Sequence, residues 1–201
     1  MASRTQKAHG IVATVVVLLA AFSLAACGGG SGDVDPGNAA DAPDFSAAIE
    51  AAPPALAALY AKGGVIEPGG LDAYEEQIAE LEGYPIVVNN WASWCGPCRE
   101  EFPHLQEQVA ERGAEVAFLG VDVEDSDEAA ETFLSGHPLP YPSFSDPDRD
   151  ISSALAANFG TPSTVFYNPA GEITYVKTGV YTSADELAAD IDRYAIEGRS
   201  N

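Results

Sequence analysis

Residues 87–103 read Val-Val-Asn-Asn-Trp-Ala-Ser-Trp-Cys-Gly-Pro-Cys-Arg-Glu-Glu-Phe-Pro, and this stretch decides the fold. Apolar, β-branched residues lead into it and predict a buried strand over 84–90. A run of helix formers, 99–109, follows the cysteines. A strand, a tight turn and a helix place Cys95 at or near a helix N-terminus, where free N–H groups and the helix dipole stabilise a thiolate. Cys98 lies one turn later, near enough to attack a mixed disulfide on Cys95.

The motif Trp-Cys-Gly-Pro-Cys at 94–98 resembles the active site of thioredoxins. Pro103 stands where thioredoxins carry the proline that kinks the active-site helix. The wider pattern of residues 87–103 is more similar to the membrane-anchored TlpA/ResA-like thiol-disulfide oxidoreductases. This resemblance covers about residues 70–197. It implies an α/β, thioredoxin-like three-layer fold with a central mixed sheet, an inserted helix and strand segment, and an N-terminal extension.

The same resemblance implies roles for the residues of the motif. Cys95 would be the attacking thiolate and Cys98 the buried resolving thiol. Gly96 and Pro97 hold the turn and add no charge, which resembles the reducing members of the family more than the oxidising ones. Trp94 is expected either to line the rim beside the disulfide and meet the substrate, or to pack as an ordinary side chain.

Glu101 lies three residues after Cys98 on the expected helix, so the two side chains are neighbours. ResA-like proteins carry a glutamate at this offset that is implicated in proton handling at the resolving thiol; the alternative is a solvated helix acid. Plain thioredoxin has a buried aspartate six residues before its first active cysteine, where this chain has Asn89. Because asparagine cannot take a proton, Glu101 is the better candidate. Asn90 stands where the family usually has an aromatic residue.

The second decisive stretch is Phe-Gly-Thr-Pro-Ser-Thr-Val-Phe at 159–166. A proline directly before a strand is permitted, so Pro162 could simply begin one. In thioredoxin-like proteins this position holds a cis-proline that faces the cysteines, and Thr161 would then offer its backbone to an extended substrate segment. Cys98 and Pro162 are 64 residues apart, more than in plain thioredoxin, and an additional segment at 125–159 accounts for the excess.

The remaining periodicities after residue 70 alternate between helix and strand. Helices are expected over 71–81, 125–135, 151–159 and 184–197, the last with Leu187, Ile191 and Tyr194 on one face. Strands are expected over 115–123, 163–168 and 173–177, with the last two forming a hairpin and with one more short strand inside the turn-rich segment 139–148.

Residues 1–27 have the proportions of a secretory signal: a basic segment is followed by an apolar segment of 14 residues, which is short for a membrane span. The closing Leu-Ala-Ala-Cys resembles a bacterial lipobox, in which the cysteine is acylated and becomes the new N-terminus. We therefore expect a lipidated Cys27 that anchors the protein to the outside of the bacterial cell membrane. An uncleaved anchor or cleavage elsewhere are the alternatives, and both also place the domain outside the cytoplasm.

Three further segments are expected after the signal. Residues 28–43 have the composition of a flexible linker, with a reach of about 20–25 Å. Residues 44–70 form an N-terminal extension, in which 44–62 are alanine-rich and expected to be helical with an interruption at Pro53-Pro54, and glycine and proline residues break the chain again over 63–70. The thioredoxin-like domain then occupies residues 71–197.

Charge and cysteine content exclude several classes. A formal charge of −22 would repel nucleic acid and anionic lipid headgroups. With Cys27 acylated, only Cys95 and Cys98 remain, so one mature molecule has no structural disulfide and lacks the second cysteine pair of a zinc ribbon. His104 beside these cysteines would make at most a partial metal site. We expect no metal, no cofactor and no nucleic acid partner.

We therefore predict a monomeric, extracytoplasmic thiol-disulfide oxidoreductase that reduces protein disulfides with electrons from a membrane or extracytoplasmic donor. Cytochrome c maturation would suit the family. A disulfide-forming oxidase of the same fold is one alternative, and a copper-handling chaperone is another. A redox-silent scaffold lipoprotein is a third, against which the intact cysteine pair argues. Peroxide reduction is not expected, because the usual sequence context of a peroxidatic cysteine is absent.

Overall fold

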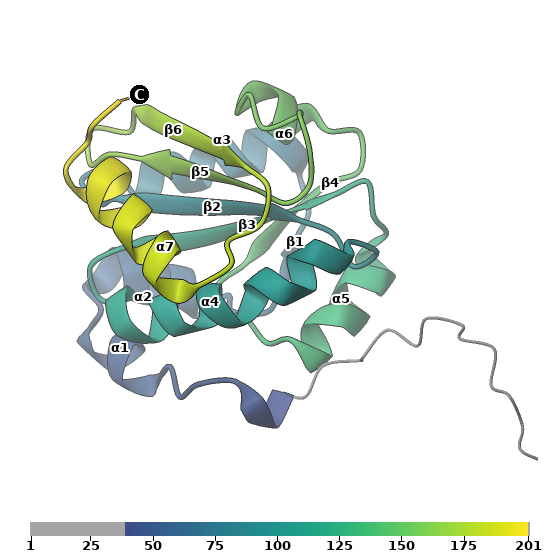
Figure 1. The fold of residues 1–201 in the computed structure, drawn as a ribbon, viewed down its shortest axis with the longest axis horizontal. Helices are drawn as coiled ribbons and strands as arrows, with labels where there is room; N and C mark the ends of the chain where they lie inside the picture. The colour runs from purple at the N-terminus through teal and green to yellow at the C-terminus, as the bar shows by residue number, and fades with distance from the viewer. Residues whose placement is uncertain (1–38, 201) are drawn as a thin grey trace, which may run out of the picture. The chain divides into compact units, whose positions relative to one another are not determined.

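The structure is a computed structural model that describes residues 39–200 (Figure 1). The predicted signal segment, Cys27 and most of the predicted linker lie outside the described residues. In chain order the elements are η1 (Ala39–Asp41), α1 (Ser46–Ala51), α2 (Pro54–Tyr60), β1 (Ile66–Glu67), α3 (Gly70–Glu80), β2 (Ile86–Trp91), α4 (Gly96–Arg112), β3 (Ala117–Val123), α5 (Asp127–Gly136), β4 (Ser143–Asp146), α6 (Asp150–Ala154), β5 (Ser163–Tyr167), β6 (Ile173–Thr178), α7 (Ala184–Asp190) and η2 (Ile191–Ile196).

The six strands form one sheet in the order β1-β4-β3-β2-β5-β6. Strands β1, β4, β3 and β2 run parallel to one another, whereas β5 is antiparallel to β2 and β6 is antiparallel to β5. Every residue of β2 and β3 is buried, because helices cover both faces of the sheet at its centre. The central mixed sheet predicted from the sequence is confirmed.

The helices form the two outer layers. Figure 1 shows α4 and α7 in front of the sheet and α3 behind it, and α3 also contacts α6. Successive residues of β2 point to these opposite layers: Asn89 reaches Glu101 on α4, and Asn90 reaches Ser152 on α6. The sheet therefore brings side chains from α4 and from β2 together on one face, which is where the cysteines lie.

The helix predicted over 151–159 is wrong in its second half. α6 ends at Ala154, and Ala156 takes a left-handed conformation with φ of 53°. The N–H of Ala157 turns back to the carbonyl of Ser152 at 2.8 Å. An irregular segment therefore leads from α6 into β5.

Two other elements differ from the expectation. The helix predicted over 184–197 ends at Asp190 as an α-helix and continues as the π-helical turn η2, although Leu187, Ile191 and Tyr194 are all buried as expected. Strand β1 was not predicted, since two residues are too short to show a period. It lies at the edge of the sheet, parallel to β4.

The extension over 44–70 contains two helices separated at Pro53-Pro54, as predicted. Leu56 and Leu59 of α2 are buried in the main core, and the hydroxyl of Tyr60 donates to the carbonyl of Val116 at 2.7 Å. The extension thus packs into the same core as the rest of the domain. Among residues 39–200, no helix is both long enough and apolar enough to cross a membrane.

Candidate active site

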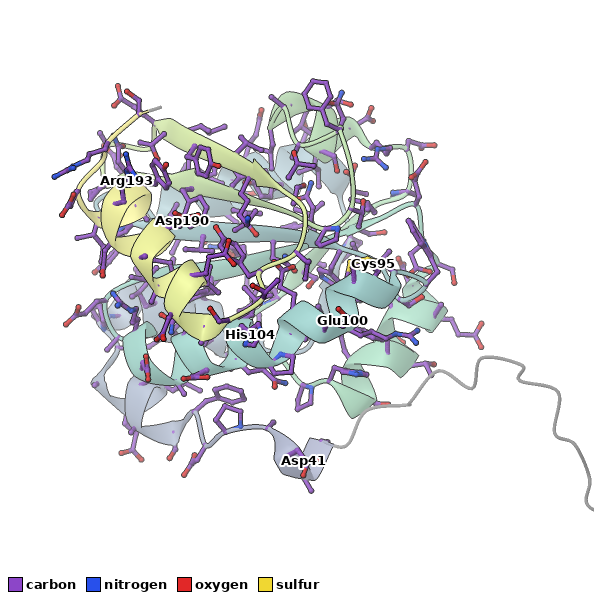
Figure 2. The ribbon with its side chains drawn as sticks, viewed as in Figure 1. Asp41, Cys95, Glu100, His104, Asp190 and Arg193 are labelled. Atoms are coloured by element: carbon purple, nitrogen blue, oxygen red, sulfur yellow. A yellow bond between two sulfur atoms is a disulfide. The ribbon has the colours of Figure 1, made fainter. Side chains whose placement is uncertain are left out.

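Cys95 and Cys98 form a disulfide at the start of α4, with their Cα atoms 5.3 Å apart (Figure 2). Cys95 is the N-cap residue of α4, and its Sγ accepts a hydrogen bond from the Cys98 N–H at 3.2 Å. The predicted position of Cys95 at a helix N-terminus is confirmed. Cys98 is fully buried and Cys95 is 3% exposed, whereas Gly96 and Pro97 are exposed between them. A free N–H group of the helix therefore points at the sulfur that would carry the thiolate.

The end of β2 is anchored by Trp91, four residues before Cys95. Its indole N–H donates to Ser143 Oγ at 3.0 Å, and its ring stacks on Phe133 of α5 with centroids 5.2 Å apart. Phe102 of α4 meets both rings edge-on. This aromatic cluster joins β2, α4 and α5, so the strand that leads to the disulfide and the helix that follows it have a fixed relation.

Glu101 lies on α4 three residues after Cys98 and is fully buried, so the alternative of a solvated helix acid is wrong. One carboxyl oxygen accepts from Asn89 Nδ2 and the other from the Tyr181 N–H, each at 3.1 Å. Burial raises the pKa of Glu101 to about 7, and the two hydrogen bonds offset part of that rise. A carboxyl group with a pKa near neutrality is suited to exchanging protons with a neighbouring thiol.

Asn89 therefore makes a contact that was not predicted from the sequence. It cannot take a proton, yet it presents an N–H group to the Glu101 carboxyl. Asn90 points to the opposite face of the sheet, where its Nδ2 donates to Ser152 Oγ at 3.3 Å. The residue that replaces the family's usual aromatic side chain thus binds α6 and does not touch Glu101.

A second group of residues around Glu101 was missed by the sequence analysis. Tyr181 gives its backbone N–H to Glu101, and its hydroxyl donates to Asp190 at 2.7 Å. Lys177 lies over the Tyr181 ring at 4.7 Å from the centroid, and its Nζ is 3.2 Å from a Glu186 oxygen. Tyr181 is 80 residues from Glu101 and follows β6 in a loop, so no spacing in the sequence indicates this contact.

The Thr161–Pro162 peptide bond is cis, which confirms the prediction for this bond. It lies directly before β5, whose first residue, Ser163, pairs with Asn90 near the end of β2. Cys95 follows the same end of β2, so the cis peptide bond and the disulfide both lie at the end of the sheet where β2 ends and β5 begins. Pro162 is buried and its carbonyl accepts from Gly179 at 2.9 Å, whereas Thr161 is partly exposed.

Trp94 is 55% exposed, and its indole N–H donates to the carbonyl of Glu124 at 3.0 Å. The indole N–H therefore fixes the Trp94 side chain, and the rest of the ring is exposed to solvent beside Cys95. Together with the exposed Gly96 and Pro97, it forms the accessible rim of the site. The described site residues named from the sequence thus lie just before α4, in its first two turns, or directly before β5.

A mixed sheet between helical layers, with a Cys-Gly-Pro-Cys disulfide at the start of a helix and a cis-proline before the neighbouring antiparallel strand, defines a thioredoxin-like fold with a redox-active cysteine pair. Sequence comparison gives the family. The profile of the AhpC/TSA family matches residues 40–176, and the chain belongs to this family.

Two curated relatives confirm the similarity to ResA-like proteins. The chain is 29% identical over 109 residues to the thiol-disulfide oxidoreductase ResA of Bacillus subtilis (strain 168), a match that covers 54% of this chain and 60% of ResA. It is 32% identical over 143 residues to the thiol:disulfide interchange protein HelX of Rhodobacter capsulatus, covering 71% of this chain and 78% of HelX. The match to ResA thus spans less than two thirds of that protein's length.

Among solved structures, the chain is similar to a secreted disulfide oxidoreductase of Mycobacterium tuberculosis described as homologous to Escherichia coli DsbE. The sequences are 30% identical and the TM-score is 0.51, over 57% of this chain and 84% of that one. This similarity confirms the predicted thioredoxin-like fold.

Proposed function

We propose that this protein is a thiol-disulfide oxidoreductase that acts on protein disulfides through Cys95 and Cys98. The observation that carries the proposal is the disulfide at the first turn of α4 with the buried Glu101 three residues further along the same helix. An acid that is buried without a cation bonded to it costs stability, so a purely structural role does not account for it well. The names of ResA and HelX support the same activity.

The proposed reaction in the reducing direction has two exchanges. The Cys95 thiolate attacks one sulfur of the substrate disulfide, forms a mixed disulfide, and releases the other substrate sulfur as a thiolate that takes up a proton. Cys98 then gives its proton to the Glu101 carboxylate and attacks Cys95 Sγ. The second substrate sulfur leaves and is protonated. Two electrons pass to the substrate, and Cys95 and Cys98 end as a disulfide.

Substrate binding is proposed at the exposed rim. The backbone of Thr161, before the cis peptide bond with Pro162, would pair with an extended segment of the substrate in the manner of an added strand. Trp94 would contact the same segment through its open face, and Gly96 and Pro97 leave the approach to the disulfide free of bulky side chains. A folded protein with a recessed disulfide could not reach this site, which favours unfolded or flexible substrates.

We further propose that the protein works as a monomeric reductase outside the cytoplasm and is held to the membrane by a lipidated Cys27. A membrane or extracytoplasmic dithiol donor would reduce the Cys95–Cys98 disulfide after each turnover. The uncharged Gly96-Pro97 dipeptide and the lipobox-like sequence before Cys27 support this. Reduction of apocytochrome cysteines before haem attachment is the role that we propose for it. Acyl chains would provide the membrane affinity that a surface of this negative charge does not.

The test is the equilibrium reduction potential of the Cys95–Cys98 pair, measured against a dithiothreitol or glutathione series, together with turnover of a model peptide disulfide. We expect a potential in the range of reducing thioredoxins, about −270 mV, and turnover that Cys95→Ser abolishes. A potential near that of strong oxidants, about −120 mV, would instead assign the disulfide-forming direction. Absence of exchange with any peptide disulfide would overturn the activity itself.

A further inference from the structure

The loop that follows β3 holds the loop that precedes the cysteines. Asp125 Oδ2 accepts a hydrogen bond from the backbone N–H of Ser93 at 2.6 Å, and the neighbouring carbonyl of Glu124 accepts from the Trp94 indole at 3.0 Å. Ser93 and Trp94 are the two residues immediately before Cys95. Two adjacent residues of one loop thus bind the two residues that position the N-cap of α4.

The holding loop is itself fixed. Asp125 Oδ1 accepts from the Ser126 N–H at 2.9 Å, so both carboxyl oxygens are engaged. Glu124 has a left-handed backbone, with φ of 51°, its N–H donates to the Asp146 carbonyl at 3.2 Å, and its carboxylate is 2.6 Å from Arg149. A non-glycine residue keeps such a conformation only where its surroundings impose it. The loop that carries Asp125 is therefore fixed by contacts other than the hydrogen bond to Ser93.

Ser93 is held from its other side as well. Its carbonyl accepts a hydrogen bond from the Arg99 guanidinium, and that guanidinium lies over the Phe133 ring at 5.3 Å from the centroid. The Cys95 N–H in turn donates to the carbonyl of Ala92 at 3.1 Å. Both polar groups of the Ser93 backbone are thus fixed, the N–H by an anion and the carbonyl by a cation.

We propose that Asp125 is a positioning residue for the redox pair: its hold on the Ser93 N–H keeps Cys95 at the start of α4, and so maintains the reactivity of the Cys95 thiolate. This inference rests on the proposed function of Cys95 as the attacking thiol. The helix dipole acts only within the first turn, so a small displacement of Cys95 away from the Cys98 N–H removes the stabilisation of its thiolate.

Asp125 has two opposing effects on Cys95, and substitutions can separate them. Its negative charge disfavours a nearby thiolate, whereas its hydrogen bond to Ser93 keeps the sulfur where a thiolate is favoured. Asp125→Ala removes both the charge and the acceptor. Asp125→Asn removes the charge and keeps one carbonyl oxygen that can accept from Ser93. Asp127→Asn is the matched control, because Asp127 is an exposed acid nearby whose carboxylate accepts from Ser145 and makes no hydrogen bond to Ser93 or Trp94.

The experiment measures the rate of alkylation of Cys95 by iodoacetamide against pH, with the three substitutions in a reduced Cys98→Ser background. We expect Asp125→Ala to lower the rate at pH 7 by about two- to fivefold and to move the midpoint of the pH profile upward. Asp125→Asn should restore the rate, and the Asp127→Asn control should keep the rate or raise it slightly. Circular dichroism and urea unfolding verify that each variant is folded.

The proposal would be overturned if Cys95 in Asp125→Ala is alkylated at the same rate as in the Asp127→Asn control, or at a higher rate. Asp125 would then act on Cys95 through its charge alone. Failure of Asp125→Asn to restore the rate would overturn it as well, since the acceptor would not be the feature that matters. Alkylation needs no substrate disulfide. If the wild type does not exchange with peptide disulfides, the proposed function fails, while the comparison of alkylation rates still decides the role of Asp125.

Discussion

The side-chain amide of Asn89 donates a hydrogen bond to the Glu101 carboxyl at 3.1 Å in the interior of the protein, and Glu101 lies three residues after Cys98 on α4. Asn89 is neutral and donates a hydrogen bond, whereas an aspartate at the same position would add a negative charge and raise the pKa of Glu101 further. The amide favours the charged form of Glu101, and burial disfavours it. The pKa of about 7 is the balance of these effects, and it makes Glu101 responsive to the pH range in which thiols exchange.

Asn89→Ala tests that balance. Without the amide, Glu101 Oε2 loses its donor, so the carboxylate is less stabilised and the pKa of Glu101 should rise by about one unit, as expected for one hydrogen bond to a charged group. The measurement is a carbonyl-detected NMR titration of Glu101 in the oxidised protein. Asn90→Ala is the control, because Asn90 points to α6 and should leave the titration unchanged. An unaltered midpoint in Asn89→Ala would show that the amide does not stabilise the carboxylate.

Glu101→Gln tests the proposed role as a proton acceptor. The deprotonated carboxylate exists above pH 7, so resolution of a mixed disulfide by wild-type Cys98 should accelerate as the pH rises through about 7. Glutamine removes this acceleration, and we expect resolution at pH 7.5 to slow on the order of 10- to 100-fold. Alkylation of Cys95 should stay unchanged or become slightly faster, because a nearby negative charge is lost.

The matched control is Glu100→Gln, one residue away on the same helix but exposed to solvent (Figure 2). Stopped-flow reduction of a model disulfide follows the resolving step in each variant. If Glu101→Gln resolves mixed disulfides at the wild-type rate, or if Glu100→Gln slows resolution equally, the catalytic role of Glu101 is wrong.

Asp122 should make the protein less stable as the pH rises. It is 1% exposed, and neither of its carboxyl oxygens accepts a hydrogen bond from a described residue. Burial, followed by the negative charges of Asp125, Asp127 and Asp146, raises the pKa of Asp122 to about 8. Because the folded protein binds this proton more tightly than the unfolded chain, the contribution is fully present below about pH 4 and is lost as the pH rises towards 8.

Asp122→Asn removes this pH dependence. Urea denaturation at pH 5 and at pH 8 gives the unfolding free energy of the variant and of the wild type. The difference, variant minus wild type, should be larger at pH 8 than at pH 5 by a few kcal/mol. Glu131→Gln carries the same charge change at an exposed position, is not among the charges that raise the pKa of Asp122, and should show a much smaller difference. Equal pH slopes for the wild type and Asp122→Asn would mean that Asp122 is ionised in the folded protein at neutral pH.

Local sequence patterns were enough for the part of the site that lies within one strand, turn and helix. The apolar run before Trp91 and the helix formers after Cys98 are short-range signals, and they placed Cys95 at the start of α4 correctly. The Asn89–Glu101 contact could also have been expected, because residues 87, 89 and 91 share a face of β2. That face is the one covered by α4.

Other features depend on contacts that no local pattern encodes. Tyr181 reaches Glu101 from a loop that only the arrangement of β6 and α7 brings near. Asp125 was expected as an ordinary acid in the first turn of a helix, yet it lies in the loop before α5 and binds Ser93. The end of α6 was also mispredicted, since Ala156 is a good helix former that adopts a left-handed conformation here.

Lipid anchoring remains a prediction, because Cys27 lies outside the described residues. Two or more acyl chains hold a protein on a membrane stably, whereas one chain gives only marginal binding. Cys27→Ala should therefore release the mature protein into the soluble extracytoplasmic fraction or leave it unprocessed. Cell fractionation and mass spectrometry of the mature N-terminus follow this. Wild-type protein with an unmodified Cys27 would refute the lipid anchor.

The two thiols should divide the reaction between them. Cys95, as the N-cap residue of α4, meets the Cys98 N–H and the positive end of the helix dipole, so its pKa should lie below the reference of about 8.5. Cys98 is fully buried and needs Glu101 as a base. Cys98→Ser should therefore trap a peptide disulfide as a stable adduct on Cys95, while Cys95→Ser should form none. Mass spectrometry of both variants after mixing with the peptide identifies the adduct, and an adduct of equal yield on Cys98 in Cys95→Ser would show that either thiol can attack.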